Sequence, residues 1–217
     1  GLMKALSILN KKNLHGLKLA KKAIFFEQKI MKEVVGSQDQ IASSIGGFNK
    51  IKFLKNDKFI INRIPKKNLN NLNSNLMLLF TGIQRKAHNI AKNYVNKLSN
   101  KKEKNVLKIM KFVDVAERLI LNNDLHNFGR LMNEAWQEKK LLSKTITNNK
   151  IDNLYNYALR NGALGGKLLG AGGGGFLLLY VPKEKQLGLS RKLKNLIHVP
   201  FRFSYQGSHE ILNTVRK

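Results

Sequence analysis

The stretch that most constrains the fold is GALGGKLLGAGGGGFLLLY, Gly162 to Tyr180, in which eight glycines lie between runs of aliphatic side chains. Glycine costs about 0.5–1 kcal/mol relative to alanine inside a helix or strand, so this density indicates a backbone that needs positive φ or a close approach. The apolar run from Phe176 to Val181 is typical of a buried strand. The stretch therefore predicts a strand, a glycine-rich turn and a second strand.

Two well-known phosphate-binding motifs fit this stretch poorly. In a Walker A loop a glycine is required where Asn161 stands, and a serine or threonine where Leu168 follows Lys167. The dinucleotide pattern GxGxxG should open a helix, whereas here a strand follows. That pattern occurs at Gly170, Gly172 and Gly175. What remains is a loop whose N–H groups point into a concavity for an anion, or a plain hairpin loop without a ligand.

Length and composition limit the class of protein. The 217 residues suffice for a hydrophobic core in one domain or two small ones. The absence of cysteine excludes a disulfide framework and thiolate metal sites, and it is compatible with a cytoplasmic protein. No apolar run has the length of a membrane span. No histidine pairs with another or with a carboxylate at metal-ligand spacing, and no GxSxG elbow is present, which disfavours metalloenzymes and serine hydrolases.

The net charge of +27 would ordinarily suggest nucleic acid as a partner. The lysines, however, are spread along almost every segment together with many asparagines, and no nucleic-acid-binding module is recognisable. The same positive field would attract a phosphorylated small molecule. We therefore expect an anionic small-molecule ligand, with neither nucleic acid nor a membrane as the partner.

Hydrophobic periodicity predicts an α+β fold in which helices pack on an antiparallel sheet. Helices are expected at residues 2–9, 14–35, 85–98, 106–121, 124–142, 151–160 and 182–196. Strands are expected at residues 48–53, 58–64, 76–80, 176–181 and 199–205. Pro65 to Ser74, rich in lysine and asparagine, is predicted to be a linker and the domain boundary.

Glu27 is an unusual residue for the place that it occupies. It lies on the same helical face as Ala20, Ala23 and Ile24, which is otherwise apolar. A carboxylate is costly to bury there unless a partner compensates its charge. The partner is either one of the many lysines, in a salt bridge, or a metal ion.

Asp39 lies in GSQDQ, between glycines that indicate tight backbone turns. Ser37 and Gln40 have the spacing of a capping box, which predicts Ser37 as the N-cap of a short helix and Asp39 as its N2 residue. The helix N-terminus would stabilise the Asp39 anion. Capping alone is one explanation for this acid.

Two segments resemble, in this order, the acid-containing segment and the third motif of the GHMP kinases, which phosphorylate small molecules. They are GSQDQIASSIGGFN from Gly36 and KLLGAGGGGFLLLY from Lys167. With TGIQRKA from Thr81 and EAWQEKKLLS around Trp136, the chain is most similar to the heptose 7-phosphate kinases within that superfamily. The resemblance implies the GHMP kinase fold, with an incomplete N-terminal domain over residues 1–74 and a C-terminal domain over residues 75–217. The serine-rich phosphate loop of the family would precede Gly1.

The resemblance also implies a reaction. ATP, with Mg²⁺, would phosphorylate the C1 hydroxyl of a heptose 7-phosphate to the 1,7-bisphosphate, a precursor of surface polysaccharide, in the cytoplasm. Asp39 matches the catalytic aspartate, and Glu27 matches the Mg²⁺-binding glutamate. Alternatives are an inactive remnant, a sugar-phosphate-binding module, or a kinase for fucose or another sugar.

The remaining site residues are also implied by the resemblance. The loop would close over the acceptor and the transferring phosphoryl group, and it consists of Gly170, Ala171, Gly172, Gly173, Gly174 and Gly175. Arg85 and Lys167 are candidates to bind the phosphate of the substrate, and Gln38 to contact a sugar hydroxyl.

Overall fold

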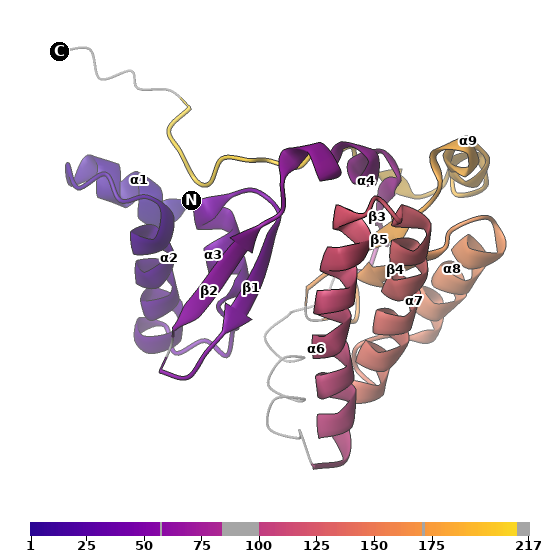
Figure 1. Cartoon of the computed structure of the whole chain (residues 1–217), viewed down its shortest axis with the longest axis horizontal. Coiled ribbons are helices and arrows are strands. Elements are labelled where there is room, and N and C mark those ends of the chain that lie inside the picture. Colours follow the sequence, from indigo (N-terminus) through magenta and orange to yellow (C-terminus); the bar gives the residue numbers. More distant parts are fainter. Residues whose placement is uncertain (57, 84–99, 171, 212–217) are drawn as a thin grey trace. The chain divides into compact units, whose positions relative to one another are not determined.

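The computed structural model describes residues 1–56, 58–83, 100–170 and 172–211. They form two compact units, each described by itself below (Figure 1). Unit 1 comprises residues 1–65 and the described residues from Phe203 onward, and unit 2 comprises Lys66–Arg202. The division thus falls between Pro65 and Lys66, and the family's domain boundary after residue 74 remains a prediction.

Unit 1 begins with three helices: α1 (Leu2–Leu9), α2 (Gly16–Phe25) and α3 (Gln38–Ile45). The predicted helix over residues 14–35 is shorter than expected. It becomes a π-helical turn, η1, at Phe26–Ile30, and Lys32 with a φ of +55° lies beyond its end. α2 packs against α3, and Leu19, Ala20 and Ile41 are buried.

Unit 1 also contains a β-hairpin. Strands β1 (Asn49–Phe53) and β2 (Phe59–Arg63) pair antiparallel, with Ile51 opposite Ile61, which confirms the two strands predicted here. The last described residues return to this unit, because the Gly47 N–H donates to the carbonyl of Ser204 at 2.7 Å.

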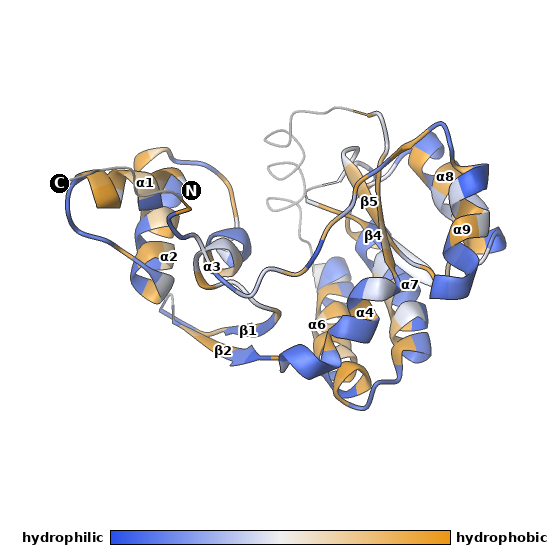
Figure 2. Cartoon of the chain, turned by 90° about the horizontal axis from the view of Figure 1, so that it is seen from above, coloured by the Kyte–Doolittle hydropathy of each residue, from blue (hydrophilic) through white to orange (hydrophobic). Residues whose placement is uncertain are grey.

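Unit 2 contains the antiparallel sheet. Its strand order is β4 (Gly165–Leu168), β5 (Phe176–Tyr180), β3 (Leu76–Phe80) and β6 (Ile197–His198). The helices α6 (Asn100–Leu121), α7 (Leu125–Leu142), α8 (Asn149–Arg160) and α9 (Lys183–Lys192) accompany it, and the core joins α7, α8 and α9 to the strands. Figure 2 shows hydrophobic and hydrophilic residues side by side on these helices, as expected where one face is buried. The predicted α+β fold is confirmed.

Two predictions for unit 2 are wrong. The expected linker at residues 65–74 instead forms a 3₁₀ turn, η2 (Lys66–Asn68), and helix α4 (Asn70–Ser74), because Leu69 and Leu72 are both fully buried in the unit. The expected strand at residues 199–205 does not form, since Pro200 has no N–H to donate to a sheet; the short strand β6 ends just before it, at His198. The expected helix at residues 85–98 lies outside the described residues.

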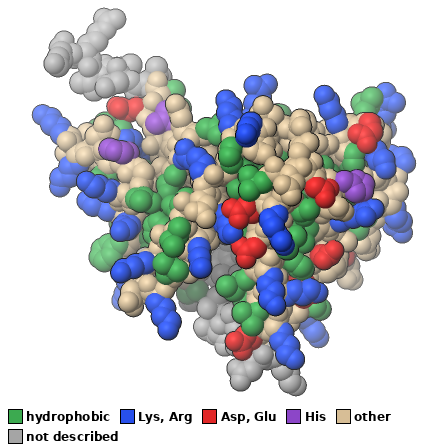
Figure 3. Space-filling view, viewed as in Figure 1, with side chains coloured by type: hydrophobic (Ala, Val, Ile, Leu, Met, Phe, Trp, Pro, Cys, Tyr) green, Lys and Arg blue, Asp and Glu red, His purple; other side chains and the backbone are tan. Residues whose placement is uncertain are grey.

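None of the described helices is both long and apolar enough to cross a bilayer. Figure 3 shows lysine and arginine side chains spread over the visible face of the described residues, without a single dense patch.

Candidate functional site

Glu27 lies in the π-helical turn η1, where the sequence predicts a regular α-helix. The turn is closed by the Met31 N–H, which donates to the carbonyl of Phe26 at 2.9 Å. A π-turn inserts one extra residue and redirects the side chains around it, and such turns are frequent at functional sites. Glu27 is half-buried there.

Gln40 holds the Glu27 carboxylate. Its side-chain N–H donates to Oε2 of Glu27, from the first turn of α3 to η1. Gln40 is buried, and its own carbonyl oxygen Oε1 has no hydrogen-bond partner in the part of the chain that the structure describes. Within that same part, no salt bridge joins Glu27 to a lysine, so its partner is a neutral amide.

Asp39 occupies the position that the sequence predicts. Ser37 is the N-cap of α3, and Asp39 is exposed at N2, where the helix N-terminus favours a negative charge. The expected capping box does not form. The Ser37 hydroxyl accepts from Nε2 of Gln28 at 3.3 Å and Gln40 turns to Glu27, so both side chains connect α3 to η1. Gln38 is exposed beside Asp39.

The side chains of Glu27 and Gln40 are compatible with one magnesium ion bound by both of them. The described residues contain no group of three or more histidine, aspartate or glutamate side chains that would hold a metal ion alone. The Glu27 carboxylate and the unpartnered Oε1 of Gln40 are oxygen donors of the kind that Mg²⁺ prefers. Since Mg²⁺ usually keeps waters and takes further ligands from substrate phosphates, this donor set fits a Mg²⁺ bound together with a phosphate.

The glycine loop of unit 2 joins β4 to β5, and the predicted strand–loop–strand is confirmed. Close packing explains much of its glycine content. A Cβ at Gly172, whose φ is +110°, would lie 2.7 Å from the carbonyl oxygen of Ile146, and one at Gly174 would lie 2.5 Å from that of Ile83. Only glycine fits at these two positions. Ala171 lies outside the described residues.

The N–H groups of this loop do not all face an anion, contrary to expectation. Gly173 donates to the carbonyl of Ile146 at 2.9 Å, and Gly175 donates to that of Ile83 at 2.8 Å. Both bonds tie the loop to neighbouring segments of unit 2. Those two N–H groups are therefore not available to an anion, so cationic side chains beside the loop are the next candidates to bind one.

Lys139 supplies such a side chain, although the sequence did not single it out. It lies in the last turn of α7, and its Nζ donates to the carbonyl of Gly170 at 3.1 Å. Burial and the nearby charge of Lys167 together lower the pKa of Lys139 to about 8. The only sequence signal was its place in the EAWQEKKLLS block.

Lys167 lies in β4 and is exposed. Alternate side chains of a strand share a face, so Lys167 is on the same face as Gly165. That face meets α7, because a Cβ at Gly165 would lie only 2.1 Å from the carbonyl oxygen of Gly129. The structure thus brings Lys167 and Lys139 together, while Arg85 lies outside the described residues.

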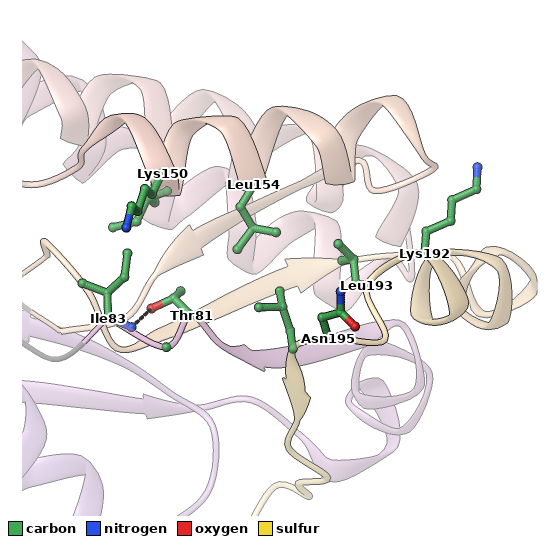
Figure 4. Close-up of a pocket in the computed structure, with 10 residues that line it drawn as sticks. Thr81, Ile83, Lys150, Leu154, Lys192, Leu193 and Asn195 are labelled. Carbon is green, nitrogen blue, oxygen red and sulfur yellow. Dashed lines mark hydrogen bonds between the residues drawn. The ribbon is translucent and has the colours of Figure 1, made fainter.

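A separate pocket of about 410 Å³ lies in unit 2 (Figure 4). The Thr81 hydroxyl accepts from the Ile83 N–H at its edge, and Lys192 points away from the apolar side chains. None of the predicted site residues lines this pocket. Its lining residues are Thr81, Gly82, Ile83, Lys150, Ile151, Leu154, Lys192, Leu193, Asn195 and Leu196.

Comparison with known proteins identifies the superfamily. Residues 116–197 match the family described as GHMP kinases C terminal. The D-glycero-alpha-D-manno-heptose 7-phosphate kinase of Campylobacter jejuni subsp. jejuni serotype O:2 is 31% identical over 179 residues, which are 81% of this chain and 53% of that protein. The chain belongs to the GHMP kinases. The resemblance inferred from the sequence is therefore confirmed.

Other relatives support the same fold for this GHMP kinase chain. The mevalonate kinase of Methanocaldococcus jannaschii is 30% identical over 196 residues, 89% of this chain and 58% of that protein. A putative sugar kinase structure from Campylobacter jejuni has a TM-score of 0.71 at 27% identity, covering 95% of this chain and 60% of that one. A D-glycero-D-manno-heptose 1-phosphate kinase structure from Bacteriodes thetaiotaomicron has a TM-score of 0.68 at 25% identity, covering 97% and 60%. The chain thus spans little more than half of these relatives.

Proposed function

We propose that this chain provides the acidic and substrate-facing part of an ATP-dependent sugar-phosphate kinase. The substrate is D-glycero-D-manno-heptose 7-phosphate, phosphorylated at C1 to the 1,7-bisphosphate, as the name of the 31% identical Campylobacter relative suggests. The observation that carries the proposal is the link between η1 and α3, in which Gln40 holds Glu27 beside the helix that presents Asp39. Those two acids match the metal and catalytic acids of the family.

Each acid has a defined task in this proposal. Phosphoryl transfer depends chiefly on positioning and on stabilising charge, and a bound Mg²⁺ neutralises the phosphate oxygens. Glu27 and the carbonyl of Gln40 would hold that ion. Asp39, at the N-terminus of α3, orients the acceptor hydroxyl and takes its proton.

The proposal also assigns a task to each of the other predicted residues. Gln38, exposed beside Asp39, contacts a sugar hydroxyl. The loop from Gly170 to Gly175 approaches the transferring phosphoryl group, since it carries almost no side chains. Lys167 and Arg85 bind the substrate phosphate.

The proposal also covers domains and cellular role. Residues 1–74 would be the remainder of the N-terminal domain of the family, and residues 75–217 the C-terminal domain, within which the family match at 116–197 falls. The product would serve surface polysaccharide synthesis in the cytoplasm. A kinase for another sugar is the second candidate, because a bifunctional fucokinase/GDP-fucose pyrophosphorylase of Arabidopsis thaliana is 28% identical over 130 residues.

The test is phosphoryl transfer from ATP in the presence of Mg²⁺, with heptose 7-phosphate or fucose as acceptor and the product identified by ³¹P NMR. Asp39→Asn should lower turnover by about tenfold or more, equivalent to roughly 1.4 kcal/mol. Glu184→Gln, an exposed acid in the first turn of α9, is the matched control and should have no effect.

Calorimetry separates the remaining outcomes. Binding of heptose 7-phosphate without binding of ATP would favour a sugar-phosphate-binding module or inactive remnant. Phosphoryl transfer to fucose but not to heptose 7-phosphate would make fucose the substrate instead of the heptose. Unaltered turnover in Asp39→Asn would show that Asp39 is not the catalytic acid.

A further inference from the structure

Helix α7 and strand β4 run side by side toward the glycine loop. Gly165 at the start of β4 lies against Gly129 and Asn133 of α7, since a Cβ there would be 2.1 Å from one backbone atom and 2.6 Å from the other. Further along both elements, Lys139 at the end of α7 reaches Gly170, which follows β4. This close backbone contact fixes the place of the Lys139 ammonium beside the loop.

Lys139 differs from the neighbouring lysines in its partner. Lys140 pairs with Asp152 at 3.2 Å, and Lys108 pairs with Glu138 at 2.5 Å. In the described ranges, Lys139 has no carboxylate partner and donates only to a backbone carbonyl. An ammonium group that has lost part of its water shell without gaining an anion is costly.

A second cation raises that cost. Burial is the larger cause of the lowered pKa of Lys139, and the nearby positive charge of Lys167 in β4 is the second. Lys140 and Glu138, the charged neighbours on α7, are engaged in the pairs above, and Tyr155 of α8 donates to Asn133 at 2.9 Å. A dianion between Lys139 and Lys167 would offset both the burial and the repulsion.

There is also space for such an anion beside the loop. Apart from Gly170 itself and its two chain neighbours, no described atom lies within 4 Å of the place that a Cβ at Gly170 would occupy, and Gly170 has a φ of +72°. The side-chain-free backbone there permits close approach by a ligand.

We infer that Lys139, whose ammonium donates to Gly170, and Lys167 of β4 form a binding site for the dianion of a phosphate monoester. The site stands on the geometry of unit 2 alone. Its identification with the 7-phosphate of the sugar rests on the proposed function, and the terminal phosphate of a nucleotide is the other source of the same chemistry. Lys139 thereby joins the substrate-binding residues.

Isothermal titration calorimetry of the purified chain tests the site, with inorganic phosphate, heptose 7-phosphate and ATP as separate probes. A bound dianion should restore the charge of Lys139, so at pH 8 binding should take up about half a proton, measured as the difference between two buffers of unlike ionisation enthalpy. Lys139→Met keeps the aliphatic stem beside Trp136 but should abolish the uptake and weaken binding by about tenfold or more.

The controls distinguish charge from folding. Lys139→Arg should recover most of the affinity, because it restores the cation. Lys140→Ala removes the adjacent cation of the same helix turn and should change the affinity by less than about twofold. Proton uptake on binding of heptose 7-phosphate assigns the site to the sugar phosphate, whereas proton uptake with ATP alone assigns it to the nucleotide.

Two results would overturn the site: binding and proton uptake in Lys139→Met equal to those of the unaltered chain, or no binding of any of the three probes. Failure of the proposed kinase function looks different. In that case turnover is absent, but the loss of phosphate binding in Lys139→Met is still observed.

Discussion

Gly165 is the position at which a single methyl group should most clearly separate α7 from β4. A Cβ there would lie 2.1 Å from the carbonyl oxygen of Gly129 and 2.6 Å from the backbone nitrogen of Asn133, whereas ordinary contacts begin at 3.4 Å. One element must therefore retreat by more than 1 Å, and both contacting atoms belong to helix backbone that cannot rotate away. Overpacking a core typically costs about 1–3 kcal/mol, and we expect Gly165→Ala at the upper end, near 3 kcal/mol.

The measurement is urea unfolding followed by the fluorescence of Trp136, the single tryptophan, which is buried in unit 2 and reports on α7. Gly188→Ala is the control, because Gly188 lies in α9, where an added Cβ would have no described atom within 4 Å apart from its chain neighbours and the backbone of its own helix. It should stabilise unit 2 by up to about 1 kcal/mol through helix propensity. Gly165→Ala should also weaken phosphate binding, as it moves Lys139 away from Gly170. A cost below about 0.5 kcal/mol for Gly165→Ala would refute the close α7–β4 contact as a constraint.

Two further predictions concern buried polar groups of unit 2. The pKa of Lys139 is about 8 in the folded chain and higher in the unfolded chain, so above pH 8 the unfolded state binds more protons. The free energy of unfolding should therefore rise between pH 8 and 9.5. Urea titrations should find this rise diminished in Lys139→Met. Tyr155→Phe removes the hydroxyl that donates to the side-chain oxygen of Asn133 at 2.9 Å, but Gln137 also donates to that oxygen, at 3.1 Å. Thermal unfolding should therefore show a loss of stability of only about 0.5–1 kcal/mol. A loss above about 3 kcal/mol would contradict this account.

Local patterns predicted most elements well. The two short strands predicted at residues 48–53 and 58–64 form the hairpin β1–β2, and the apolar run Leu76–Phe80 predicts β3, the strand that lies between β5 and β6. Asp124 is the N-cap of α7, accepting from the Asn127 N–H at 3.3 Å. These features depend on residues that are close in sequence, so they can be predicted without knowledge of tertiary contacts.

Errors arose where distant residues decided the conformation. The segment at residues 65–74 looks like a linker by composition, yet Leu69 and Leu72 are buried and anchor it in unit 2. Periodicity cannot reveal the π-turn that contains Glu27, because one inserted residue leaves the apolar pattern nearly intact. Gln40 likewise looks like a capping residue until the structure places it against Glu27.

By itself, the sequence determined that a strand–loop–strand surrounds Gly170 to Gly175, that Asp39 stands at a helix N-terminus, and that the chain resembles the GHMP kinases. The tertiary structure decided what each glycine is for. Gly165, Gly172 and Gly174 are required by the close approach of Gly129, Ile146 and Ile83, respectively. It also decided that Lys139 meets Gly170, since only the packing of α7 on β4 brings together two residues that lie far apart in the chain.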